Sequence, residues 1–304
     1  MFKGYRLRDY NFKLVILVLI ATVFGTIVIN SADSSYTNKQ IIGLIGCLCV
    51  MAFLSFFDYH YFCKLWLVIY GINLIMLIGL IPFGKTVNNA KRWYGIGDFM
   101  TIQPSEFTKL FMIICMAVLL TKLKDKLNTW KSLLLIAVFC APPLLLIKKQ
   151  PDLSTTVDIF LIMVAMVYVT GLSYKLIGIV ALILVPLSSV FFWYIQQPGQ
   201  KLLNDYQLGR ILAFRYPQDY ALTTGYQQTN SVMAIGSGML TGKGLTSDSL
   251  ATVKDANLIS EQQTDFIFSV VGEELGFIGC VFIIAILLLI VLQCIRCLLY
   301  TSDA

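Results

Sequence analysis

Four carboxylates stand at the start of a long apolar run in residues 260–279, SEQQTDFIFSVVGEELGFIG. They are Glu261, Asp265, Glu273 and Glu274. A carboxylate beside an apolar helix can act as a general base, pair with a cation or accept hydrogen bonds between helices. Asp265 precedes the apolar run, so we expect it at the membrane boundary. Glu273 and Glu274 could lie near that boundary or well inside it, and for this pair hydrogen bonding between helices is the interpretation we favour.

A second polar cluster, residues 88–110, combines cations, an acid, an amide and an indole. Its candidate site residues are Lys91, Arg92, Trp93, Gln103, Glu106 and Lys109. Pro104 suits the first turn of a helix, Glu106 then lies where the helix dipole favours an acid, and Lys109 follows on the same face. An acid and a base in an apolar helix require a wet cavity or a partner. The alternatives are a structural ion pair that holds helices together and, for Trp93, a place in the interfacial aromatic belt.

A third polar segment, residues 148–158, allows two interpretations at each of its main positions. Lys148 and Lys149 could bind a lipid phosphate or simply extend their ammonium groups to the headgroup level. Asp152 could cap the N-terminus of a helix or contact a substrate. The residues alone do not decide between these roles.

The glycines of a fourth segment, residues 225–244, are another candidate. They are Gly236, Gly238, Gly242 and Gly244. Glycine permits a tight backbone bend or close approach of the backbone to a ligand. The Walker pattern of a phosphate-binding loop is absent, so this segment by itself assigns no ligand.

The elements that must position these residues are apolar helices. Of the 304 residues, 58% are hydrophobic and 13% are charged, and the mean hydropathy is +0.78. Roughly a quarter of the residues of a soluble domain would be charged. The apolar segments lie near 13–30, 40–57, 62–82, 104–121, 131–147, 152–170, 174–195 and 266–295. Because only helices satisfy the backbone of such segments in lipid, we predict an all-α, polytopic transmembrane bundle of about eight helices, forming a single domain over residues 1–304.

The basic residues of the short links predict the orientation of this bundle. They cluster before the first segment, between the fourth and fifth segments, and after the eighth, which indicates a cytoplasmic N-terminus. The links 83–103, 148–151 and 196–264 are then extracellular. The last is far longer than usual, and its aromatic and aliphatic content favours a folded functional element over disorder. All four polar clusters therefore converge on the outer membrane face, where they could hold an anionic amphiphile.

Several other classes of site are excluded or disfavoured. His60 is the only histidine, which excludes Ser-His-Asp and Cys-His catalysis and a multi-histidine metal site. The eight cysteines lie mostly in apolar runs and are interpreted as small core residues rather than disulfides or zinc ligands. No internal repeat of the transporter type is present. Nothing in the sequence indicates a nucleic-acid partner.

Five ordered motifs resemble those of the SEDS family (shape, elongation, division and sporulation), which includes RodA, FtsW and SpoVE. The motifs are AKRW followed by QPSEFTKL at 90–110, QPDLSTT at 150–156, RILAFRYPQDYALTTGYQ at 210–227, IGSGMLTGKG at 235–244 and the opening stretch at 260–279. Departures from the family pattern are Ser154 and Met239 in place of glycines, Asn230 in place of glutamine, and Gln263 in place of histidine. The family has ten helices, so the resemblance implies a C-terminally truncated chain, most like RodA.

This resemblance implies a peptidoglycan glycosyltransferase that polymerises lipid II and releases undecaprenyl diphosphate. It implies that Asp265 is the general base that takes the proton from the acceptor sugar hydroxyl. Four cations would offset charge on the departing diphosphate, namely Lys91, Arg92, Lys109 and Lys148. Glu106 would hold Lys109 in place, and Trp93 and Gln103 would shape the acceptor side. The remaining expected substrate-binding residues are Asp152, Glu261 and Thr264.

The resemblance also implies partners and a location. We expect a class B penicillin-binding protein as transpeptidase partner, and lipid II, undecaprenyl-linked glycan and membrane lipid as ligands. The expected location is the bacterial cytoplasmic (inner) membrane, with the active site facing outward. A divalent cation, Mg²⁺ or Mn²⁺, is compatible with a diphosphate but has no ligand signature in the sequence. The competing hypotheses are a flippase or transporter of lipid-linked precursors and a non-catalytic scaffold for a penicillin-binding protein. A role in cell division, as for FtsW, remains the alternative to cell elongation.

Overall fold

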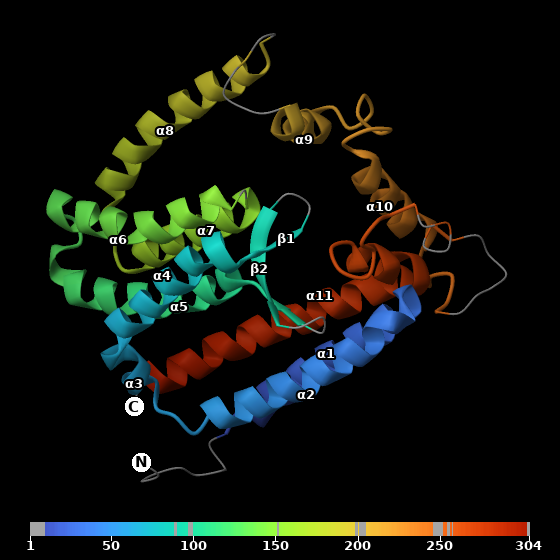
Figure 1. Cartoon of the computed structure of the whole chain (residues 1–304), viewed down its shortest axis with the longest axis horizontal. Coiled ribbons are helices and arrows are strands. Elements are labelled where there is room, and N and C mark those ends of the chain that lie inside the picture. Colours follow the sequence, from blue (N-terminus) through green and yellow to red (C-terminus); the bar gives the residue numbers. More distant parts are fainter. Residues whose placement is uncertain are drawn as a thin grey trace. The chain divides into compact units, whose positions relative to one another are not determined.

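Helices dominate the structure (Figure 1), a computed structural model that describes residues 10–87, 90–96, 100–150, 152–197, 200, 205–245, 252–253, 256 and 258–302. The contacts among these residues group the chain into two compact units. Unit 1 combines Met1–Phe56 with Tyr194–Ala304, and unit 2 is Phe57–Trp193. That the whole chain forms a single domain stays a prediction.

Eight long helices lie at the positions of the eight apolar segments. They are α1 (Phe12–Ala32), α2 (Thr37–Leu54), α4 (Trp66–Phe83), α5 (Pro104–Leu123), α6 (Trp130–Lys149), α7 (Leu153–Val169), α8 (Tyr174–Ile195) and α11 (Ile267–Ser302). Within the described residues, six of them are long and apolar enough to cross a membrane. The other two are α5 and α7, whose crossings rest on the sequence pattern. The predicted fold class, a polytopic helical bundle, is confirmed.

Shorter elements fill the links between the long helices. They are α3 (Tyr59–Lys64), α9 (Asp205–Arg215), α10 (Tyr226–Ser237) and the 3₁₀ turns η2 (Ser34–Tyr36) and η3 (Lys124–Lys126). Both α9 and α10 lie in the segment 196–264, so that segment is folded in part, as its composition indicates.

A small antiparallel sheet follows α4, and the sequence analysis did not predict it. Its strands are β1 (Lys85–Val87), β2 (Ala90–Ile96) and β3 (Met100–Ile102), in the order β1-β2-β3. Lys85 pairs with Trp93, and Tyr94 pairs with Ile102. The hydroxyl of Tyr94 donates to the carbonyl oxygen of Met76 in α4 at 2.8 Å, which fastens the sheet to the bundle. Strands of three residues are too short to produce a recognisable alternating pattern.

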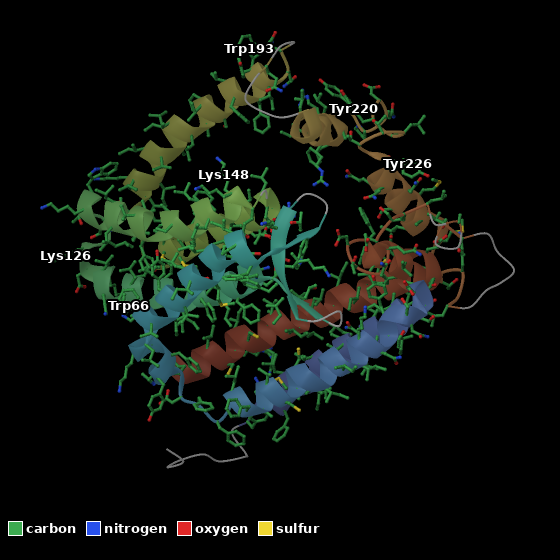
Figure 2. All side chains as sticks on the ribbon, in the orientation of Figure 1. Trp66, Lys126, Lys148, Trp193, Tyr220 and Tyr226 are labelled. Carbon is green, nitrogen blue, oxygen red and sulfur yellow. The ribbon has the colours of Figure 1, made fainter. Side chains whose placement is uncertain are left out.

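Unit 2 is built from α4, α5, α6 and α7 around one apolar core. Its buried side chains include Leu77, Met116, Ile147 and Ile159. In Figure 2, Lys148 marks the C-terminal end of α6, and Lys126 marks the turn η3, which precedes α6. Arg92, in the sheet that follows α4, contacts Gln150 at the end of α6, and Gln103, just before α5, contacts Asp152, just before α7. The C-terminal ends of α4 and α6 therefore lie at the same end of the unit as the N-terminal ends of α5 and α7. The predicted site residues of unit 2 gather at this end.

Unit 1 packs α1 antiparallel to α11, with α2 beside α1. Val28 of α1 and Val270, Val271 and Cys280 of α11 form the buried core between them. The antiparallel order is set by two contacts, from Ser31 to Glu274 at one end and from Gln293 to Asn11 at the other. The start of α11 therefore lies beside the end of α1.

The long helix α11 has a break at Gly276. Gly276 has φ 63° and ψ −159°, outside the helical region. The amide nitrogen of the following residue, Phe277, donates to the carbonyl oxygen of Met239 at 2.9 Å. The helix thus breaks where a second segment of chain crosses it, at a residue whose backbone needs glycine.

None of the eight cysteines, all of which lie within the described residues, forms a disulfide bond, and only some are core residues. Cys115, Cys140 and Cys280 are buried, and Cys63 is partly buried. The other four lie on exposed helix surfaces, so their interpretation as core residues is wrong. An apolar residue of a membrane-spanning helix has two suitable environments, the core and the lipid, and sequence does not separate them.

Candidate functional site

Two cations of β2 bind the ends of neighbouring helices in unit 2. The ammonium group of Lys91 donates to the carbonyl oxygen of Ile81 in the last turn of α4, at 3.2 Å. Nε of Arg92 donates to the carbonyl oxygen of Gln150 at the end of α6, at 3.1 Å. Unpaired carbonyls and the negative end of the helix dipole both attract cations at these positions. The sheet thus brings positive charge to one end of the bundle.

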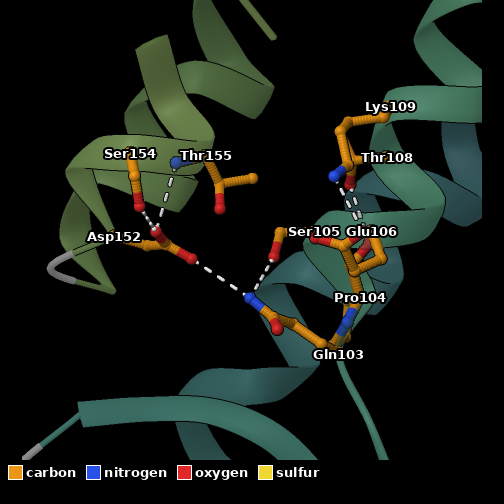
Figure 3. Close-up of polar contacts among 9 residues, drawn as sticks. All are labelled: Gln103, Pro104, Ser105, Glu106, Thr108, Lys109, Asp152, Ser154 and Thr155. Atoms are coloured by element: carbon orange, nitrogen blue, oxygen red, sulfur yellow. Dashed lines mark hydrogen bonds and ion pairs between the residues drawn. The ribbon is translucent and has the colours of Figure 1, made fainter. Parts of the chain in front are cut away.

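Asp152 joins the starts of two helices (Figure 3). It is 3% exposed, and its carboxylate caps α7 by accepting from the N–H of Thr155 at 3.3 Å and from the hydroxyl of Ser154 at 3.2 Å. The side-chain amide of Gln103 donates to the same carboxylate at 3.1 Å and to the hydroxyl of Ser105 at 2.9 Å. The capping interpretation of Asp152 is therefore confirmed, and Gln103 has a structural role that the sequence analysis did not identify.

Glu106 and Lys109 form an ion pair within α5 (Figure 3). Their nitrogen–oxygen distance is 2.7 Å, and the side chains are 54% and 30% exposed. Both residues belong to one helix, so the pair does not hold two helices together. The alternative interpretation, an ion pair between helices, is therefore wrong. An exposed pair of this kind is worth at most about 1 kcal/mol of stability. It leaves a positioned ammonium group at the polar end of unit 2.

Lys148 and Trp93 complete the predicted residues of unit 2. Lys148 is exposed at the end of α6 and has no partner among the described residues. Trp93 is partly buried in β2, opposite Lys85. The structure thus brings Lys91, Arg92, Trp93, Gln103, Glu106, Lys109, Lys148 and Asp152 to the same end of unit 2.

Asp265 lies in unit 1, in a tight turn that ends at the start of α11. The carbonyl oxygen of Glu261 accepts from the N–H groups of Thr264, Asp265 and Phe266, at 3.2, 3.1 and 3.4 Å. Glu261 has φ 56°, a left-handed conformation that is uncommon for a residue with a side chain. The Asp265 side chain is exposed and has no hydrogen-bond or ion-pair partner within the described part of the chain. The turn therefore presents a free carboxylate.

Two amides of α10 hold the segment that leads into this turn. Nδ2 of the buried Asn230 donates to the carbonyl oxygen of Leu258 at 3.0 Å. The side-chain amide of Gln227 donates to the hydroxyl of Ser260. Asn230 stands where the family motif has glutamine, so this departure from the motif keeps an amide in contact with the loop. Its role could have been suspected from that chemical similarity.

A polar cavity of about 620 Å³ lies beside the turn. It is lined by residues 30–34, from the end of α1 to the start of η2, and by residues 259–263, which include Glu261. Hydrogen bonds from the side chain and the N–H of Ser35 hold the pKa of Asp33 in this cavity below its usual value. Asp33 therefore gives the cavity a negative charge at neutral pH. The lining residue Glu261 stands four positions before Asp265 in the chain.

Glu273 and Glu274 are buried, each 1% exposed, and both bind distant segments of unit 1. Glu273 accepts from the ammonium group of Lys243 at 2.7 Å and from the N–H of Val253 at 2.7 Å. Glu274 accepts from the hydroxyl of Ser31 in α1 at 2.6 Å. The interpretation favoured for this pair, hydrogen bonding between helices, describes the contact of Glu274 with α1, whereas Glu273 bonds to residues outside the helices. Lys243 was not a candidate from sequence, because nothing local marks its partner.

The glycine-rich segment packs against the backbone of α11. The N–H groups of Lys243 and Gly244 donate to the carbonyl oxygens of Glu273 and Glu274, both at 2.9 Å. A side chain at Gly238 or Gly242 would overlap these carbonyls or their neighbours. The close approach expected of these glycines is therefore to the protein's own backbone. Met239 has φ 50°, so the position where the family motif has glycine does adopt a left-handed backbone.

The predicted site residues divide between the units. Asp265, Glu261 and Thr264 belong to unit 1, and the predicted cations belong to unit 2. That they form one site stays a prediction. No group of three or more histidine, cysteine, aspartate or glutamate side chains that could hold a metal occurs in the described ranges. A divalent cation also stays a prediction.

Comparisons with known proteins agree with this architecture. The model of the FtsW/RodA/SpoVE family, described as "cell cycle protein", matches residues 11–304. The chain is 33% identical over 228 residues to a probable peptidoglycan glycosyltransferase FtsW of Haemophilus influenzae, which covers 73% of this chain and 53% of that protein. It is 30% identical over 316 residues to the protein of the same name from Trichlorobacter lovleyi, covering 99% of this chain and 79% of that protein.

A third relative is the peptidoglycan glycosyltransferase MrdB of Escherichia coli, 33% identical over 231 residues, with 74% of this chain and 58% of that protein covered. The chain thus spans little more than half the length of two of these three relatives.

Two solved structures share the fold. One is described as showing the coordination of polymerization and crosslinking by a peptidoglycan synthase complex, with TM-score 0.71 and 24% identity, covering 93% of this chain and 76% of that one. The other is the rod shape determining protein RodA of Thermus thermophilus, with TM-score 0.60 and 22% identity, covering 93% and 73%. Together with the membrane-spanning helices and the family match, they identify a multi-pass membrane protein. The chain belongs to the FtsW/RodA/SpoVE family.

Proposed function

We propose that this chain is a peptidoglycan glycosyltransferase that polymerises lipid II at the outer face of the bacterial cytoplasmic membrane. The observation that carries the proposal is Asp265, an exposed carboxylate without a partner among the described residues, at the start of a spanning helix in a chain of this family. The relatives named peptidoglycan glycosyltransferase support the reaction class. A general base must be free to accept a proton, and Asp265 meets that condition.

In the proposed reaction, an acceptor sugar hydroxyl attacks the anomeric carbon of the donor. The new bond forms from the hydroxyl oxygen to that carbon, and the bond from the carbon to the diphosphate oxygen breaks. Asp265 takes the hydroxyl proton, and undecaprenyl diphosphate leaves with the electron pair. General-base catalysis of this kind contributes about 10²- to 10⁴-fold.

Cations of unit 2 would offset the charge of the leaving diphosphate. Lys109 is held by Glu106 at 2.7 Å, and Lys148 has no partner in the described part of the chain. Lys91 uses one of its three donors on the end of α4. Preorganised cations stabilise charge that develops in a transition state because they need no reorganisation.

The order of the helices along the chain supports a shared site. Three links are concerned, 83–103, 148–151 and 196–264. Two predicted membrane crossings separate the first link from the second, and two separate the second from the third. If all eight helices cross, these links face the same side of the membrane, outward under the predicted orientation. Asp265 and the cations would then meet the same substrate.

An apolar cavity in unit 2 suits the lipid part of such a substrate. It has a volume of about 1110 Å³ and lies between α6, α7 and α8. Its lining is almost entirely aliphatic and aromatic, including Leu144, Phe160 and Val180. A polyprenyl chain has matching chemistry, whereas a soluble nucleotide sugar would have nothing to place there.

The test is the substitution Asp265→Asn, which keeps the shape of the side chain and removes its basicity. We expect glycan synthesis from lipid II to fall by at least about 100-fold. Membrane insertion and thermal stability should not change, because Asp265 has no described partner to lose. The matched control is Asp219→Asn, an exposed carboxylate elsewhere in unit 1, which should retain activity. Full activity of the Asp265→Asn protein would remove Asp265 from the role of base.

We further propose a class B penicillin-binding protein as the partner that crosslinks the product. The structural neighbour described as a peptidoglycan synthase complex that coordinates polymerization and crosslinking supports such an assembly. The relatives include both FtsW and MrdB, so they are compatible with a role in division or in elongation. Synthesis by the purified pair in detergent, where no lipid needs to be moved across a membrane, would separate polymerisation from a flippase or scaffold function.

A further inference from the structure

An amphipathic groove lies between α1 and α11, at the opposite end of unit 1 from the Asp265 turn. Its volume is about 350 Å³. Its lining includes the cations Lys13 and Arg296, the amide Gln293, and the apolar side chains of Ile16, Leu289 and Leu292. None of them has a part in the reaction proposed above.

The groove begins where the packing between the two helices ends. Toward the Asp265 end, α1 and α11 share the core around Val28, and the rings of Phe24 and Phe282 lie 5.2 Å apart. At the other end, Nε2 of Gln293 donates to Oδ1 of Asn11, the N-cap residue of α1, at 3.1 Å. The helices are therefore fastened on both sides of the groove, which makes it a built feature of unit 1.

The polar end of the groove carries two positive charges that have no counterion among the described residues. Lys13 and Arg296 are exposed and have no partner among the described residues. The sequences of α1, α2 and the part of α11 that follows Glu274 contain no carboxylate. The first turn of α1 adds the positive end of a helix dipole beside Lys13. The two cations come from helices far apart in sequence and lie in the same groove. Cations that only extended to the headgroup level would not need to lie together.

The remainder of the groove is apolar and open. Ile16, Leu289 and Leu292 are 54%, 48% and 43% exposed. A soluble anion would use only the charged end of the groove, and a zwitterionic lipid would bring its own cation to the two that are already there. A lipid with a net negative headgroup and an acyl chain complements both parts.

We propose that this groove binds one anionic phospholipid, with its phosphate between Lys13 and Arg296 and an acyl chain along Ile16, Leu289 and Leu292. Binding there would tie the first helix of the chain to the long helix that carries Asp265 at its other end. The proposal does not depend on the catalytic function proposed above.

The experiment compares lipids with the same acyl chains and different headgroups. The purified protein in detergent is titrated with dioleoyl phosphatidylglycerol or with dioleoyl phosphatidylcholine, and bound lipid is counted by native mass spectrometry. We expect retention of the anionic lipid alone. The double variant Lys13→Gln, Arg296→Gln should weaken that binding by about tenfold or more, since each cation near an anionic headgroup is worth about 1 kcal/mol.

Four further measurements make the result specific. Lys39→Gln removes a cation at the other end of unit 1 and should leave binding unchanged. Lys13→Arg with Arg296→Lys keeps both charges and should also retain the lipid. Leu292→Asn should weaken binding if the acyl chain lies on the apolar wall. Inorganic phosphate at millimolar concentration should not displace the lipid.

Three outcomes would overturn the proposal. They are equal retention of phosphatidylcholine, unchanged binding by the double glutamine variant, and displacement of the lipid by inorganic phosphate, which would indicate an ion site only.

Discussion

Two ion pairs with the same geometry occupy opposite environments in this protein. Glu106 and Lys109 in unit 2 and Glu273 and Lys243 in unit 1 both have a nitrogen–oxygen distance of 2.7 Å. The glutamate side chain is 54% exposed in the first pair and 1% exposed in the second. The first pair spans three residues of one helix, whereas the second joins residues 30 positions apart.

The difference in burial predicts different consequences for stability. Water screens the exposed pair, so its removal changes the free energy of unfolding little. The buried pair is desolvated, so removing one partner takes away an interaction that water does not replace. We therefore interpret the pair in unit 1 as part of the framework that supports the Asp265 turn. The pair in unit 2 contributes little to the stability of the protein, which favours a role in binding a substrate.

The largest expected effect is that of Glu273→Ala. It removes the buried carboxylate that accepts from the ammonium group of Lys243 and from the N–H of Val253, and we expect a loss of about 3–5 kcal/mol in the free energy of unfolding. Chemical unfolding of the purified protein in mixed micelles measures it. The control is Glu106→Ala, expected to lose less than about 1 kcal/mol. Equal losses in the two variants would contradict the comparison.

An intermediate effect is expected for Ser31→Ala. The hydroxyl of Ser31 lies within 2.6 Å of a carboxylate oxygen of Glu274 and 2.8 Å of the carbonyl oxygen of Leu245. Its loss removes a donor from a buried carboxylate, which costs about 1–3 kcal/mol. The same unfolding measurement applies, with Ser34→Ala as an exposed control. A change no larger than that of the control would show that α1 does not depend on this contact.

Lys109→Ala is expected to have the smallest effect on stability and a large effect on activity. The free energy of unfolding should change by less than about 1 kcal/mol. Glycan synthesis from lipid II should nevertheless fall, because the proposed function assigns Lys109 to the leaving diphosphate. Lys131→Ala, an exposed lysine near the start of α6, is the control and should retain activity. Unchanged synthesis by the Lys109→Ala protein would return the pair to a local helix-stabilising role.

Sequence patterns predicted most of the helices, and they missed the elements that depend on short or distant pairing. The eight apolar segments correspond to eight helices, with ends that differ by a few residues. Strands β1 and β3 have three residues each and gain their stability from β2, so no local pattern marks them. The break at Gly276 has no local signal in the sequence, because its cause is the crossing of residues 238–244.

The candidate site was predictable to the extent that it is carried by motifs. Asp265, Glu106, Lys109 and Asp152 lie where their motifs indicated, on helix starts and a tight turn. Asn230, Lys243 and Ser31 were not identified, because their importance lies in partners 28, 30 and 243 residues away. A hydrogen bond over such a separation leaves no periodicity in the sequence.

By itself, the sequence determined the class of protein, the positions of the spanning helices and the family. Lipid provides no partners for the backbone, so long apolar segments have to be helices whatever surrounds them. The tertiary structure decided what the individual polar residues do. It separated two exposed carboxylates, Glu261 and Asp265, from two buried ones, Glu273 and Glu274, in a single motif. The physical reason is that the environment of a charge is set by the segments packed around it, and those segments are brought together only by folding.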